Sequence, residues 1–136
     1  MAKNSFQVEI LTPEGTVFDD QVEMVSTRTS VGSIGVMANH TPLLAMLDAC
    51  ELRLHVDGGI LRYAQGEGYM QVADNRAMLL VEEAVAADDL DRGALEVELT
   101  QRRSDRDAAE EGSEARRVAS RDVARLEAFL AIASSE

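Results

Sequence analysis

The chain has two histidines, His40 and His55, and one cysteine, Cys50, which are side chains of the types that serve as nucleophiles, bases and metal ligands. A cysteine beside a histidine could support nucleophilic catalysis if a carboxylate oriented the pair. Cys50 begins a predicted strand and is interpreted as a small apolar filler, whereas His55 faces outward on that strand. Two histidines and one cysteine at these spacings match no zinc site. We therefore expect no catalytic residues and no metal ligands.

Two other patterns resemble reactive sites. Gly66-Glu67-Gly68 resembles a phosphate loop, but no Lys-Ser/Thr pair follows it, and a hairpin turn is the simpler interpretation. The acidic pairs Glu82-Glu83 and Asp88-Asp89 could form an acid–base site. Their positions at a predicted strand end and helix start instead favour solvation and helix capping.

Composition limits the classes of partner. The chain has 136 residues, enough for one domain or a small domain with an appendage, and a net charge of −12. Nucleic acid and anionic lipid would be repelled, since both are bound through clustered Lys and Arg. A single cysteine excludes an internal disulfide and fits a reducing compartment. No apolar run reaches the roughly 18 residues of a membrane span, and no signal peptide is recognised, so we expect a cytosolic protein.

Residues 1–86 are expected to form an antiparallel β-sandwich or flattened barrel. Alternating apolar residues mark strands in "FQVEIL", in "QVEMVSTRT" with Val22, Met24 and Ser26 on one face, and in "CELRLHV". Asp57-Gly58-Gly59 and Asp74-Asn75 are typical of tight turns. In "HTPLLAML" the residues Leu43, Leu44, Met46 and Leu47 are expected to enter the core.

Residues 87–136 are expected to form an antiparallel helical hairpin. Asp88 or Asp89 is the predicted N-cap of the first helix, and Gly112-Ser113 separates the two helices. The first helix is predicted to carry a thin stripe of Leu90, Ala94 and Val97, with Leu95 and Leu99 to one side. The second helix carries one narrow apolar stripe, which consists of Ala119, Val123, Leu126, Leu130 and Ala133.

One stretch, "VGSIGVMANHTPLLAML" from Val31 to Leu47, combines two glycines, His40 and Pro42. Its core resembles the signature G-x-x-G-hydrophobic-x-P-G-H-x-P-hydrophobic-hydrophobic of the epsilon subunits of bacterial F-type ATP synthases. The matching residues are Gly32, Gly35, Val36, His40, Pro42, Leu43 and Leu44. Four further segments come in the same order as in that family: the opening "VEILTPEGTVF", the turn "DGGIL", the strand "LLVEEAV" and the charged helical end.

The resemblance implies a non-catalytic central-stalk subunit of the rotor rather than an enzyme. Residues 1–86 would dock on the gamma subunit and the c-ring and couple proton-driven rotation to ATP synthesis. The complex would hold the chain on the cytoplasmic face of the bacterial inner membrane, with no direct membrane contact. The residues implied at the c-ring and gamma interface are Gly32, Ser33, Ile34, Gly35, Asn39, His40 and Pro42.

The resemblance gives residues 87–136 a regulatory role. The hairpin would inhibit ATP hydrolysis by transient contacts with the catalytic beta and alpha subunits. The implied contacts are Arg102, Arg103, Arg106, Arg116, Arg117, Arg121 and Arg125. Solvated ion pairs along the helices are the alternative interpretation of these arginines.

Two positions depart from the family pattern. Ala38-Asn39 replaces the usual Pro-Gly, and Ala94-Leu95 replaces the Arg-Ala pair of a nucleotide-binding motif that begins at Leu90. We therefore expect no cofactor and weak or absent ATP binding. The competing hypothesis is a stand-alone β-sandwich binding module that forms oligomers through Val123, Leu126 and Leu130.

Overall fold

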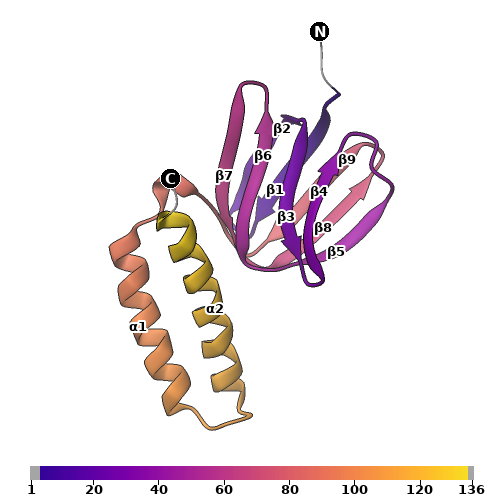
Figure 1. The fold of residues 1–136 in the computed structure, drawn as a ribbon. Helices are drawn as coiled ribbons and strands as arrows, with labels where there is room; N and C mark the ends of the chain where they lie inside the picture. Colours follow the sequence, from indigo (N-terminus) through magenta and orange to yellow (C-terminus); the bar gives the residue numbers. More distant parts are fainter. Residues whose placement is uncertain (1–3, 135–136) are drawn as a thin grey trace. The chain divides into compact units, whose positions relative to one another are not determined.

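The structure, a computed structural model, describes residues 4–134. They divide into two compact units, one that ends at Ala86 and one that begins at Ala87 (Figure 1). The first contains the strands β1 (Phe6–Thr12), β2 (Gly15–Val22), β3 (Met24–Thr29), β4 (Gly32–Met37), β5 (Leu43–Leu47), β6 (Cys50–Val56), β7 (Gly59–Gln65), β8 (Gly68–Ala73), β9 (Arg76–Val81) and β10 (Ala84–Ala86). The second contains a short 3-10 helix η1 (Ala87–Asp89) and the helices α1 (Arg92–Ala108) and α2 (Glu114–Ser134).

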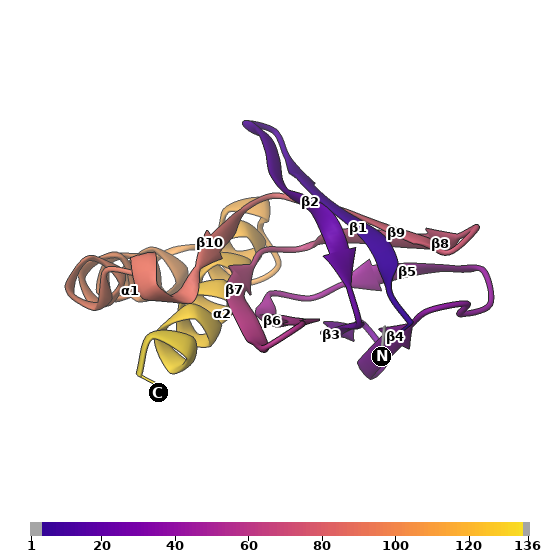
Figure 2. The ribbon, with the colours of Figure 1, turned by 90° about the horizontal axis from the view of Figure 1, so that it is seen from above.

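The strands of the first unit form one continuous sheet that folds over on itself. Their order is β10-β7-β6-β3-β5-β8-β9-β1-β2, and β4 branches off by pairing with β3. Figures 1 and 2 show two layers, with β3, β4, β6 and β7 in one and β1, β5, β8 and β9 in the other. All described pairings are antiparallel except that of β1 with β9. This flattened barrel followed by two helices confirms the predicted fold class.

The core lies between the two layers and is almost entirely aliphatic. Alternation along β1 and β6 places Val8, Ile10, Leu52 and Leu54 inside with no exposed surface. One polar side chain, Gln65, is equally buried. Its Oε1 accepts a hydrogen bond from Thr27 Oγ1 at 2.8 Å, and its Nε2 donates to the Asp48 carbonyl oxygen at 2.9 Å.

Two predicted turns are confirmed. Asp57 and Gly58 connect β6 to β7, and Gly58 has a φ of 88°. Asp74 and Asn75 connect β8 to β9 with φ values of 52° and 58°. In the Asp74-Asn75 turn both central residues have a positive φ, the geometry that matches the right-handed twist of the flanking strands, and Asn and Asp tolerate it.

The interpretation of "QVEMVSTRT" as one strand was wrong. The chain bends at Glu23, so that Val22 ends β2 and Met24 begins β3. The bend reverses the alternation: Val25 and Thr27 face the core, and Met24 is only half-buried. A one-residue shift exchanges the two faces of a strand because its side-chain period is two.

Gly66-Glu67-Gly68 is not a hairpin turn either. The strands that flank it, β7 and β8, do not pair and lie in different layers, so the segment crosses from one layer to the other. A Cβ on Gly68 would lie 1.9 Å from the carbonyl oxygen of Leu80. The glycine at position 68 is therefore required by close backbone packing.

The second unit is the predicted helical hairpin, but the N-cap of its first helix differs from the prediction. Asp91, and neither Asp88 nor Asp89, caps α1: its Oδ1 accepts a 3.0 Å hydrogen bond from the N–H of Ala94. Ser113 caps α2 by accepting from the N–H of Arg116 at 3.1 Å, as expected from the sequence. Neither described helix is long and apolar enough to cross a membrane.

A narrow apolar seam joins α1 to α2. Leu99, Val123 and Leu126 are buried in it, and Leu95 and Leu130 pack against them. The stripe predicted for the first helix was wrong, since Ala94 is exposed and Val97 is 73% exposed. The contact instead follows Leu95 and Leu99, four residues apart on one helix face.

Candidate functional site

The predicted signature segment begins at the turn between β3 and β4. Ser30 and Val31 form the turn, and Gly32 follows with a φ of 138°, which side chains other than glycine rarely adopt. The Oγ1 of Thr29 fixes the turn: it donates to the Gly32 carbonyl oxygen at 2.9 Å and accepts from the Val31 N–H at 3.2 Å. Gly32 is thus required by this turn.

The predicted interface residues fall into two groups, one on β4 and one in the connection that follows β4. The first, Gly32–Gly35, lies on the strand itself, with Gly32, Ser33 and Gly35 exposed. The second, which consists of Asn39, His40 and Pro42, lies in the connection from β4 to β5. Only the second group lies in a loop. The structure therefore does not gather these residues into one compact loop.

The β4–β5 connection is held by a turn from another part of the chain. The N–H of Asn39 donates a 2.7 Å hydrogen bond to Oδ1 of Asn75. Asn39 has a φ of 64°, so it adopts the left-handed conformation that the glycine of the family pattern would accept without strain. Next to it, Nδ1 of His40 lies 2.7 Å from the carbonyl oxygen of Thr41, a distance at which a protonated Nδ1 donates.

The environment of Cys50 favours a structural role. The thiol is buried, with Sγ 3.4 Å from Thr27 Oγ1 and 3.5 Å from Gln65 Nε2. Burial raises the pKa of Cys50 above its ordinary value, which disfavours the reactive thiolate. Within residues 4–134, no three His, Cys, Asp or Glu side chains lie close enough to hold a metal ion.

An apolar surface that the sequence prediction missed covers the outer face of one layer. Leu44 and Met46 alternate with the inward residues of β5 and are 73% and 58% exposed, so the expectation that both enter the core was wrong. Met46 pairs with Tyr69, and Tyr69 pairs with Leu80. Leu80 pairs in turn with Leu11. We call the row of Leu11, Met46, Tyr69 and Leu80 the apolar stripe.

The apolar stripe borders a groove of about 610 Å³, which Pro13, Glu67 and Glu82 also line. Tyr69 and Leu80 are each about half exposed. Exposed apolar rows of this kind, rimmed by polar residues, typically mark protein–protein contacts. The sequence held a signal for it: residues 29–47 contain no Asp, Glu, Lys or Arg, although the chain has 38 such residues.

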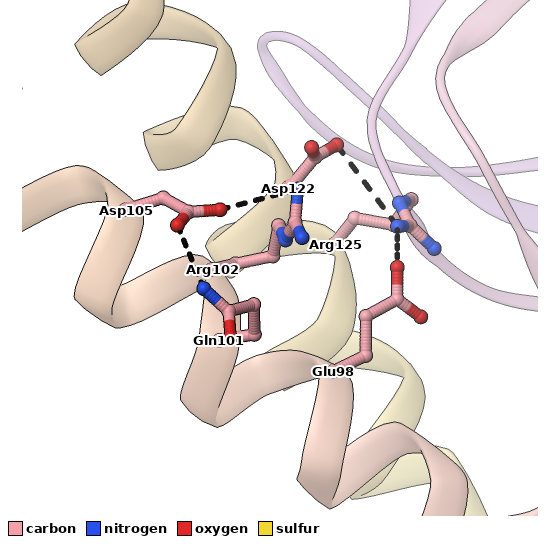
Figure 3. Close-up of polar contacts among 6 residues, drawn as sticks. All are labelled: Glu98, Gln101, Arg102, Asp105, Asp122 and Arg125. Carbon is pink, nitrogen blue, oxygen red and sulfur yellow. Dashed lines mark hydrogen bonds and ion pairs between the residues drawn. The ribbon is translucent and has the colours of Figure 1, made fainter.

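Most arginines of the hairpin form ion pairs within the second unit. Arg125 lies 3.4 Å from Glu98 on the facing helix and 3.9 Å from Asp122, and Arg102 lies 3.3 Å from Asp105 (Figure 3). Arg103 pairs across the hairpin with Glu127 at 2.9 Å. Further polar contacts within the hairpin involve Arg106 with Asp107, Arg116 with the Ala109 carbonyl oxygen, and Arg117 with Glu114.

Comparison with known families identifies the chain. Residues 5–87 match the family described as "ATP synthase, Delta/Epsilon chain, beta-sandwich domain". A relative named ATP synthase epsilon chain, from Herpetosiphon aurantiacus, is 33% identical over 124 residues, which cover 89% of this chain and 91% of the relative. This chain belongs to the ATP synthase delta/epsilon family.

Other relatives in the delta/epsilon family, and one solved structure, are also similar to this chain. The epsilon chain of Staphylococcus saprophyticus is 29% identical over 85% of this chain and 87% of its own length. The match to the epsilon chain of Roseiflexus sp. is 36% identical and covers 65% of this chain and 64% of that relative. In a solved structure, a chain of the Euglena gracilis mitochondrial ATP synthase has the same fold, with a TM-score of 0.82, 19% identity, and coverage of 96% of this chain and 82% of that one.

Proposed function

We propose that this chain is a non-catalytic rotor subunit in the central stalk of an F-type ATP synthase, where its β-sandwich couples rotation of the c-ring to the gamma subunit. Family membership and the exposed apolar stripe support this proposal. In the complex the chain would be peripheral on the cytoplasmic face of the bacterial inner membrane.

The apolar stripe is the observation that carries the proposal. A row of four apolar side chains across four strands is costly to leave in water and becomes favourable when a partner covers it. We assign this surface to the gamma subunit. The other predicted interface residues, Gly32–Gly35 together with Asn39, His40 and Pro42, would then contact the c-ring or adjoining parts of gamma.

A pair of matched substitutions tests the assignment. Tyr69 lies in the stripe at 52% exposure, and Ile60 lies on β7 in the other layer at 47% exposure. Tyr69→Glu should weaken binding to synthase lacking this subunit by about tenfold or more, as removal of a central interface aromatic does. Ile60→Glu should leave affinity nearly unchanged. Equal effects of the two variants would contradict the assignment.

We further propose that the hairpin inhibits ATP hydrolysis. Two features support this role. The apolar seam between the helices is narrow, so the hairpin could open. Its arginines, which pair with carboxylates of the hairpin, could then pair instead with carboxylates of the alpha and beta subunits. Removal of residues 88–136 should leave assembly intact and raise the rate of ATP hydrolysis. An unchanged rate would overturn the inhibitory role.

The hairpin is proposed to bind nucleotide weakly or not at all, because Ala94 and Leu95 replace the Arg-Ala pair of the family motif and Asp91 caps α1. Calorimetric titration with ATP and magnesium should show no saturable heat. The competing oligomerisation hypothesis is disfavoured because Val123 and Leu126 are already covered within the hairpin. A concentration-dependent dimer that Leu126→Glu abolishes would revive it.

A further inference from the structure

The free edge of β4 is open to pairing with another strand. Among the strands of residues 4–134, β4 pairs only with β3. It therefore presents one row of main-chain donors and acceptors away from β3. Such an edge is a template for an additional strand unless the protein blocks it.

Pairing elsewhere in the sheet shows which residues present these groups. The N–H of Ser30 donates to the Met46 carbonyl oxygen at 3.0 Å, and the carbonyl oxygen of Arg28 accepts from the Asp48 N–H at 3.1 Å. Arg28 and Ser30 thus direct their main-chain groups toward β5. Because these groups alternate along a strand, Thr29 directs its own to the opposite side, toward β4.

The main-chain groups of β4 alternate in direction in the same way. Thr29, Thr27 and Val25 lie opposite Gly32, Ile34 and Val36, and these pairs exchange the β3–β4 hydrogen bonds. The residues between them, Ser33 and Gly35, therefore direct their N–H and carbonyl groups to the free edge. No neighbouring strand of the described sheet pairs with that edge.

The edge lacks the usual protection against pairing. Natural edge strands are blocked by charged side chains, proline or bulges, and the edge strand β2 carries Asp19 and Asp20. Residues 31–37 contain no charge and no proline. A Cβ on Gly35 would meet only Met24 Sδ, at an ordinary 3.5 Å, so the isolated sandwich does not require glycine there.

We propose that β4 is completed in the assembled complex by an extended, uncharged or basic segment of a partner subunit, which pairs with the main-chain groups of Ser33 and Gly35. The proposal rests on the rotor function above and specifies how this part of its interface binds. A second copy of the chain is a poor occupant, since each copy carries a net charge of −12.

Substitutions at Ser33 separate main-chain pairing from side-chain contact. Ser33→Pro removes an N–H that the β3–β4 ladder does not use, whereas Ser33→Ala changes the side chain and keeps the N–H. Ser33→Pro should weaken binding to synthase that lacks this subunit by about tenfold more than Ser33→Ala does. Similar affinities of the two variants would overturn the proposal.

Amide hydrogen exchange on the unmodified chain provides a test that does not depend on a variant folding. On binding to the synthase, the amides of Ser33 and Gly35 should exchange at least about tenfold more slowly. Binding without such protection would overturn strand pairing and leave the rotor function intact. Failure of the unmodified chain to bind would instead overturn the rotor function. If these amides became protected in the chain alone as its concentration rose, the strand that pairs with β4 would belong to a second copy and not to a partner subunit.

Discussion

The main-chain N–H of Asn39 donates to Oδ1 of Asn75 at 2.7 Å, which ties the β4–β5 connection to the β8–β9 turn. The two asparagines are 36 residues apart, and both have positive φ values, 64° and 58°. Asn39 stands where the family pattern has glycine. The positive φ explains how asparagine replaces it, and the bond to Asn75 holds the connection in place without the usual proline.

Loss of the Asn75 side chain should therefore loosen this end of the sandwich. Asn75→Gly keeps the positive φ and removes the acceptor, and we expect it to lower the free energy of unfolding by about 0.5–1.5 kcal/mol. Asp74→Gly, in the same turn, is the control and should have no destabilising effect. Urea denaturation measures both. A loss that is equal in the two variants would show that the hydrogen bond contributes nothing.

The crossing between layers should tolerate no side chain at position 68. Gly68→Ala places a Cβ 1.9 Å from the Leu80 carbonyl oxygen, whereas Gly59→Ala places one in open space. Gly68→Ala should destabilise the domain by about 3 kcal/mol or more, since backbone must move. Gly59→Ala should change stability by less than about 1 kcal/mol. Comparable melting temperatures for the two variants would contradict this packing.

The buried amide of Gln65 should contribute strongly to the stability of the folded domain. Gln65→Met removes the amide that pairs with the Thr27 hydroxyl and the Asp48 carbonyl oxygen, and leaves the hydroxyl only its weak contact with Cys50 Sγ, at an overall cost of roughly 1–3 kcal/mol. Gln71→Met on the exposed side of β8 is the matched control and should be nearly neutral. Denaturation curves that coincide for the two variants would contradict the role of Gln65.

Glu51 should make stability depend on acid pH. Partial burial raises the pKa of this carboxyl, but hydrogen bonds from Arg62 and Arg53 outweigh burial and hold it below its ordinary value of 4.5. The folded state therefore binds a proton less readily than the unfolded state, and the carboxylate stabilises the fold above pH 4.5. This contribution should be lost as the pH falls below 4.5 toward the lowered pKa.

Glu51→Gln removes the titrating group and is the control for that experiment. The difference in unfolding free energy between the unmodified chain and Glu51→Gln should be constant above pH 5.5 or so and shrink in more acidic buffer. A difference that stays constant through this range would mean that the pKa of Glu51 is the same in the folded and unfolded states.

Local patterns predicted the fold well, and long-range contacts account for the errors. The turn at Asp57-Gly58 and the cap at Ser113 depend on neighbouring residues, so the sequence indicates them directly. The exposure of Leu44 and Met46 depends on which layer β5 joins. The requirement for Gly68 depends on the backbone of β9. The absence of charge in residues 29–47 indicates an unusual surface, but neither feature can be assigned from the local sequence.

The candidate site was predicted only in part, because long-range contacts determine the rest of it. The sequence identifies Val31 to Leu47 as the distinctive part of the chain, but as one continuous stretch. The structure distributes it over the β4 edge, the connection held by Asn75 and the outer face of β5. Leu11, Tyr69 and Leu80 complete the apolar stripe from distant strands, and only the sheet register brings them beside Met46.

Purification from native membranes through a tag on this chain tests the rotor assignment most directly. We expect gamma, the c-ring and the catalytic alpha and beta subunits to copurify with the chain, and Tyr69→Glu to reduce their yield while Ile60→Glu does not. Recovery of the chain alone, or only with further copies of itself, would contradict the account.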